Sequence, residues 1–111
     1  MFQRSKQGAV EILAGNTPLT REHLDEVAPL LEQCLSAGQP RVVVDLARVP
    51  LIDSAGLELL LDAGDRCAQR GGQFKLAAPN DLCRDILRVT DVIRRFGVFD
   101  DVLAAVGSCG Q

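Results

Sequence analysis

The sequence predicts an α/β fold: a single domain over residues 1–111, with a mixed, mostly parallel β-sheet of four to five strands covered by about four helices. Two patterns carry this prediction. The run at 41–46 is apolar without alternation, which is typical of a central strand that is covered on both faces. Segments with apolar residues at three- and four-residue steps alternate with such strands, as expected of helices that connect parallel strands.

Glycine and proline residues divide the chain into these elements. Strands are expected at 8–14, 41–46, 73–77 and 97–99, with residues 2–6 as the hairpin partner of 8–14. Helices are expected from Thr20 to before Gly38, from Ser54 to before Gly71, over 81–89 and over 102–106, with a short helical stretch at 91–96. Thr20 is the expected N-cap of the first helix, and Pro29 is expected to kink it because proline has no backbone N–H.

Each of the three longer helices is expected to bury one apolar stripe. The predicted inward-facing residues are, helix by helix, Leu24, Val27, Ala28, Leu31 and Leu35; Leu57, Leu60, Leu61, Gly64, Cys67 and Ala68; and Leu82, Ile86 and Val89. Gly64 lies on the second stripe, where the absence of a side chain would allow a neighbouring segment to approach closely.

The four cysteines contain no C-x-x-C pair, and a chain of 111 residues can build its own core, so no disulfide framework is expected. Cys34, Cys67 and Cys83 are interpreted as reduced core residues, whereas Cys109 lies in a glycine-rich tail and is expected to be exposed. The sequence shows neither a signal peptide nor an apolar run of about 18 residues. It therefore predicts a cytoplasmic protein with no direct membrane insertion.

The formal net charge is −3 and the sequence pI is near 5.0. Proteins that bind nucleic acid usually carry a basic surplus that neutralises phosphates. The basic pair Arg94-Arg95 is flanked by Asp91, Asp100 and Asp101 instead. Nucleic acid is therefore not expected as a partner.

One segment carries a candidate site. After the strand at 41–46, residues 53–56 read Asp-Ser-Ala-Gly, and Ser54 falls where the next helix begins. A helix start offers free amide donors and a positive dipole end, so a phosphate on Ser54 would be tolerated there. Ala55 and Gly56 add little bulk, which would let the active site of another protein reach the hydroxyl. The simpler interpretation is that Asp53 or Ser54 only caps the helix.

The run from Val42 to Leu61 resembles the STAS-domain family, specifically the bacterial anti-sigma-factor antagonists. The matching features are a hydrophobic strand that ends in Asp-Leu, a short apolar approach, and Asp-Ser-x-Gly-Leu at the start of a long helix. Gly71-Gly72, Ala78-Pro79 and the region 87–99 also look like that family.

The resemblance implies a partner switch without cofactors. The unphosphorylated protein would bind an anti-sigma factor that is also a serine kinase, the kinase would phosphorylate Ser54 and dissociate, and a phosphatase would reset the cycle. The dianion would repel neighbouring carboxylates such as Asp53 and Glu58. The implied partner-binding residues are Asp53, Ala55, Gly56, Leu57, Glu58, Asn16 and Thr17.

Two departures from the family pattern fall on this docking surface. Relatives of this type usually carry an acidic Gly-Glu/Asp-x-Asp element after the second strand, where this chain has the uncharged Gly15-Asn16-Thr17-Pro18. The residue after Asp-Ser-x-Gly-Leu is often small, and here it is Glu58. These changes keep a second function open, in which the domain is a non-catalytic accessory subunit of an ABC-type lipid transporter or part of a signalling scaffold. The oligomeric state is open too, with a weak homodimer as one option.

An enzyme is not expected. A serine nucleophile needs a base within hydrogen-bond reach, and His23, the one histidine, lies far from Ser54 in sequence. Ser54 also lacks the Gly-x-Ser-x-Gly elbow, because Ile52 occupies the first glycine position. No cluster of cysteine, histidine and carboxylate residues has metal-ligand spacing. No catalytic residue and no metal ligand is therefore predicted.

Overall fold

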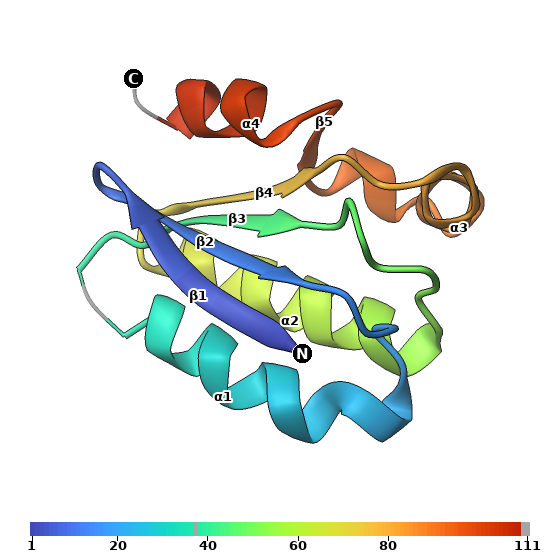
Figure 1. Ribbon diagram of the computed structural model, residues 1–111. Coiled ribbons are helices and arrows are strands. Elements are labelled where there is room, and N and C mark those ends of the chain that lie inside the picture. Colours follow the sequence, from blue (N-terminus) through green and yellow to red (C-terminus); the bar gives the residue numbers. More distant parts are fainter. Residues whose placement is uncertain (37, 110–111) are drawn as a thin grey trace.

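The computed structural model describes residues 1–36 and 38–109 and shows a five-stranded sheet with strand order β1-β2-β3-β4-β5 (Figure 1). β1 pairs antiparallel with β2, and all other neighbours are parallel. The predicted α/β fold class is confirmed. The elements are β1 (Phe2–Gln7), β2 (Val10–Gly15), the 3₁₀ helix η1 (Arg21–His23), α1 (Leu24–Cys34), β3 (Arg41–Asp45), α2 (Ser54–Gln69), β4 (Gln73–Ala77), α3 (Asp81–Val89), the 3₁₀ helix η2 (Val92–Arg94), β5 (Gly97–Phe99) and α4 (Val102–Cys109).

The sheet is covered on both faces. α1 and α2 lie on one face and α4 on the other, while α3 packs at the end of the sheet (Figure 1). Val42 and Val44 of β3 point into the larger core, and Val43 between them points into a smaller core beneath α4. All three valines are fully buried because successive side chains of a strand point to opposite faces. This is why the run at 41–46 is apolar throughout.

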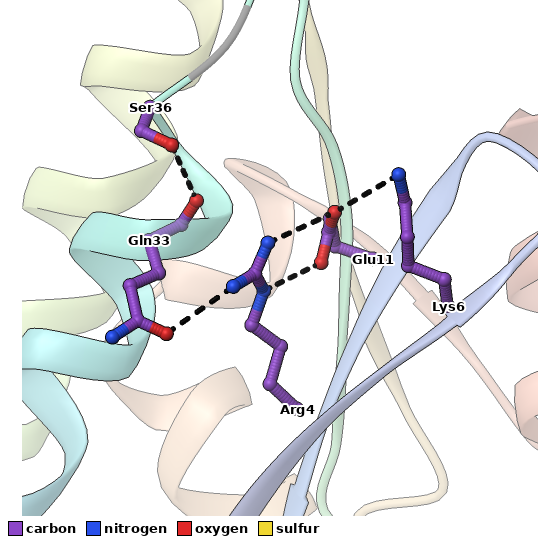
Figure 2. Close-up of polar contacts among 5 residues, drawn as sticks. All are labelled: Arg4, Lys6, Glu11, Gln33 and Ser36. Carbon is purple, nitrogen blue, oxygen red and sulfur yellow. Dashed lines mark hydrogen bonds and ion pairs between the residues drawn. The ribbon is translucent and has the colours of Figure 1, made fainter.

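Edge strand β1 is attached largely by polar contacts, because Phe2 is its one buried residue. Glu11 on β2 is a buried carboxylate that the Arg4 guanidinium contacts twice, from Nε to Oε1 at 2.8 Å and from Nη2 to Oε2 at 3.4 Å. Lys6 Nζ lies 3.6 Å from Glu11 Oε2. Arg4 also donates to the side-chain oxygen of Gln33 on α1, and the backbone carbonyl of Gln33 accepts from the Ser36 hydroxyl (Figure 2). The hydrogen bond from Arg4 holds the pKa of Glu11 below its usual value.

Two details of the first helix differ from the sequence prediction. The first helix does not begin at Thr20: residues 21–23 form a 3₁₀ turn, and α1 starts at Leu24. The Thr20 hydroxyl lies 3.1 Å from His23 Nδ1 and does not cap a backbone amide. Helix α1 continues through Pro29, so a single helix forms as expected.

The buried faces of α2 and α3 are rotated relative to the predicted stripes. Leu82 and Val89 are 52% and 79% exposed, because α3 lies at the end of the sheet and buries only its Cys83 and Leu87 side fully. In α2, Ala63 is buried in place of Ala68, which is exposed. Gly64 behaves as predicted, since an added Cβ would overlap the ring of Phe96.

Cys109 is also placed differently from the prediction. α4 extends to Cys109, and its spacing of four residues from Ala105 puts both side chains on the face that packs on the sheet. All four cysteines are free and buried. Burial raises the pKa of Cys34 and of Cys67 to about 11, and it raises the pKa of Cys83 and Cys109 as well.

We therefore expect all four thiols to resist modification in the folded protein, because both the thiolate population and the access of a reagent are suppressed. At about pH 8, a disulfide-exchange reagent should react slowly with the native chain and rapidly with four thiols in urea. A thiol of the native chain that reacts as fast as in urea would contradict this prediction. A Cys109→Ala variant would then show whether Cys109 is the reactive thiol.

The Glu11 network predicts a pH-dependent contribution to stability. Glu11→Gln should lower the free energy of unfolding at pH 7 by about 1–3 kcal/mol, because two charged donors lose their ionised acceptor. The folded-state pKa of Glu11 is depressed, so its contribution is fully present above the unfolded-state pKa and is lost as the pH falls through the folded-state pKa. The difference between wild type and variant in urea titrations should shrink accordingly. Glu22→Gln, at an exposed position, is the control; an equal effect of both changes would refute the prediction.

Candidate partner-binding site at the start of α2

Two loops meet where α2 begins. One follows β2 and the other follows β3, and Leu19 of the first forms a parallel bridge with Ile52 of the second. The Leu19 amide donates to the Leu51 carbonyl at 2.9 Å, and the Asp53 amide donates to the Leu19 carbonyl at 3.1 Å. The side chains of Leu19 and Ile52 are buried, so the two loops share part of the core.

Asp53 joins these loops to the helix. Its Oδ1 accepts the Gly56 amide at 2.9 Å, which makes Asp53 the N-cap of α2, and its Oδ2 accepts the Arg21 amide at 3.0 Å. These two hydrogen bonds, that from Gly56 first, hold the pKa of Asp53 below its usual value. Of the two candidate caps, the structure identifies Asp53, and its carboxylate is occupied by backbone donors.

Ser54 is the first residue of α2, and its side chain is exposed. In the described part of the chain its hydroxyl takes part in no hydrogen bond, in contrast to the carboxylate beside it. Ala55 is half-buried, and Glu58 is exposed one turn further along the helix. The Ser54 hydroxyl therefore makes no hydrogen bond that supports the described structure, and it is accessible to another molecule.

The structure corrects the interpretation of Gly56 and Leu57. Gly56 is buried, and a Cβ at this position would overlap the carbonyl group of Leu19. Leu57 is 9% exposed and belongs to the larger core. The small size of Gly56 therefore serves the packing of the two loops, and the argument that it opens access to Ser54 is wrong.

Asn16 and Thr17 lie in the loop after β2. Asn16 is exposed; its Oδ1 accepts from the Met1 amino group at 2.6 Å, and it lines a hollow of about 480 Å³ together with Asp45 and Arg48. The Thr17 hydroxyl is buried and has no hydrogen-bond partner among the described residues. Thr17 thus turns its hydroxyl inward, away from any docking partner.

The sequence interpretation missed the contribution of Arg21 and Leu19 to this site. Both act through backbone groups, which no residue type announces, so no sequence signal was available. Leu51 was missed as well, and it is 40% exposed in the loop that leads to Ser54. A leucine held at the surface beside a candidate site is an observation that only the structure provides.

The described residues contain no group of three or more histidine, cysteine and carboxylate side chains that could hold a metal ion. His23 Nδ1 is directed to the Thr20 hydroxyl. Among the helices described, none combines the length and the apolar character that crossing a membrane requires.

Comparison with known proteins assigns the class. Residues 2–98 match the family described as "Mlab, STAS domain". The match covers most of the chain, so the protein belongs to this STAS-domain family. A search of curated proteins found no match.

Three solved structures illustrate the likeness. A candidate anti-sigma factor antagonist from Thermotoga maritima has a TM-score of 0.92 and 23% identity, over 99% of this chain and 95% of that one. A sulfate transporter family protein from Wolinella succinogenes has a TM-score of 0.75 and 25% identity, over 95% and 88%. The Bacillus cell fate determinant SpoIIAA, in its phosphorylated form, has a TM-score of 0.73 and 14% identity, over 97% and 98%. All three share the fold of this chain.

The packing at Gly56 leads to a prediction. Gly56→Ala should lower the free energy of unfolding by about 1–3 kcal/mol, because the added methyl group meets the backbone of Leu19, which cannot move aside without breaking its hydrogen bonds. Gly107→Ala in α4 is the matched control, since a Cβ there meets nothing within 4 Å. It should leave stability unchanged or raise it by up to about 1 kcal/mol. Equal urea midpoints for the two variants would contradict the packing argument.

Proposed function

We propose that this chain is an anti-sigma-factor antagonist that binds an anti-sigma factor with serine kinase activity, and that phosphorylation of Ser54 ends this binding. One observation at the start of α2 carries the proposal. Asp53 caps the helix, while the exposed Ser54 hydroxyl makes no hydrogen bond among the described residues. Family membership and the fold shared with antagonists support it. The chain would act in the cytoplasm, by binding and not by catalysis.

The effect of phosphorylation follows from the charges around Ser54. A phosphoserine carries about −1.5 to −2 charges at neutral pH. It would stand next to Asp53, whose carboxylate is kept ionised by two backbone donors, and one turn from the exposed Glu58. A partner surface that accommodates Ser54, Asp53 and Glu58 would then have to desolvate the new dianion next to two carboxylates, which opposes binding. A phosphatase would restore the neutral hydroxyl.

We predict that Ser54→Ala abolishes phosphate incorporation by the cognate kinase and leaves the fold intact. The free energy of unfolding should change by no more than about 0.5 kcal/mol, because the hydroxyl makes no contact that stabilises the described structure. Incorporation is measured with labelled ATP, and Ser5→Ala, another exposed serine, is the control that should be labelled like wild type. Label retained by Ser54→Ala would refute the assignment of the phosphorylated residue.

A second experiment identifies the partner and separates the two candidate functions. Wild-type, Ser54→Asp and Ser5→Asp proteins serve as baits in lysate of the source organism. Capture of an ATP-binding serine kinase by wild type and Ser5→Asp, with at least a tenfold loss for Ser54→Asp, would support the partner switch.

Capture of transporter subunits by all three baits would favour the alternative, an accessory subunit of an ABC-type lipid transporter or a signalling scaffold. The uncharged loop after β2 and the fold shared with a sulfate transporter family protein favour this alternative enough to include it.

A further inference from the structure

Helix α4 covers the sheet face opposite α1 and α2 (Figure 1). Its inner side is buried through Ala105 and Cys109, and its outer side leaves Leu103 73% exposed, with Ala104 and Gly107 exposed beside it. None of the residues 102–109 is charged, whereas α1, α2 and α3 all carry charged residues on their outer sides. A helix that is apolar all round is normally covered on all sides. The outer face of α4 is uncharged, and the described residues leave it exposed.

The two ends of this neutral face carry opposite charges. The exposed residues Asp100 and Asp101 precede α4. Asp100 Oδ1 lies 3.1 Å from Arg84 Nη2, and Asp101 Oδ1 accepts the Ala104 amide at 2.7 Å, so this end keeps an acidic surplus of one charge beside a single arginine. At the other end Cys109 belongs to the same buried cluster as Val10, the first residue of β2, and Val43 of β3, and Arg41 is the first residue of β3. Because side chains alternate along a strand, Arg41 points to the same sheet face as Val43, which is the face that α4 covers.

We propose that the outer face of α4 binds a second copy of this chain, with the two α4 helices antiparallel across a two-fold axis. This arrangement sets the acidic start of each helix against the basic end of the other, which is a complementary contact in both halves. The middle of the face brings no charges together. Ala104 and Gly107 allow the helices to approach closely, so that Leu103 of each chain is covered by the other.

The size of the face sets the strength of the association. Eight residues of helix are about 12 Å long, so the contact is smaller than the roughly 800 Å² per partner of a standard stable interface. The dimer is therefore weak and forms as the concentration rises. Because Ser54 begins a helix on the opposite sheet face, both copies would keep this serine uncovered (Figure 1). The dimer would be bivalent toward a partner that binds there, but its formation does not depend on the proposed function.

Sedimentation velocity of the full chain under reducing conditions, from about 0.01 mM to about 1 mM, tests the proposal. The average mass should rise from that of the 11.9 kDa monomer toward twice that value. Leu103→Glu should abolish the rise, whereas Val89→Glu, at a 79% exposed site on α3, should leave it unchanged. Circular dichroism and urea midpoints confirm that both variants fold. A wild-type chain that stays monomeric, or a dimer that Leu103→Glu does not affect, would overturn the proposal.

A charge exchange tests the antiparallel orientation. Arg41→Glu and Asp100→Arg should each weaken the association at least fivefold, because each places like charges at both ends of the contact. Asp100→Arg also removes the ion pair of Asp100 with Arg84, so circular dichroism and urea midpoints of each variant serve as the folding control. The double variant should restore it to within twofold of wild type. A double variant that is weaker than either single variant would overturn the antiparallel arrangement.

Discussion

The carboxylate of Asp53 is the interaction on which the site depends. It accepts one amide from the first turn of α2 and one from the turn after β2, and so fixes two loops that are 32 residues apart in sequence. Both donors are backbone groups, so the Asp53 carboxylate is the one side-chain group that these two bonds require. The buried bridge between Leu19 and Ile52 completes the joint. The start of α2 is therefore rigidly placed, and Ser54 with it.

Under the proposed function, this arrangement assigns the structural role to Asp53 and the regulatory role to the adjacent Ser54. If Ser54 were the N-cap, its hydroxyl would accept a hydrogen bond from a backbone amide, and phosphorylation would disrupt that bond at the start of the helix. With Asp53 as the cap, the proposed phosphorylation of Ser54 would leave the hydrogen bonds of the helix start in place. A switch built in this way acts on the surface charge that a partner meets and needs no change of fold.

The sequence was sufficient for the fold class and the order of strands and helices because the period of apolar residues decides both. It placed Ser54 correctly at the start of α2 from the residue pattern alone. It failed where the outcome depends on contacts between distant segments. Gly56 and Leu57 carry no mark that distinguishes a packing role from a docking role, and the carbonyl group that covers Gly56 comes from Leu19 in another loop. Cys109 was misplaced because a glycine-rich sequence hid the continuation of α4.

The two faces of the sheet provide separate surfaces. On one face of the sheet, α2 begins with the exposed residues Ser54 and Glu58. On the other face, α4 has a neutral outer side. β3 contributes to both, since Val42 and Val44 support α2 while Val43 supports α4. A contact on one side can therefore form without competing for residues with a contact on the other. The two proposed contacts, one with a partner at the start of α2 and one with a second copy at α4, are therefore compatible, and the proposed regulation by charge would act only on the side that carries Ser54.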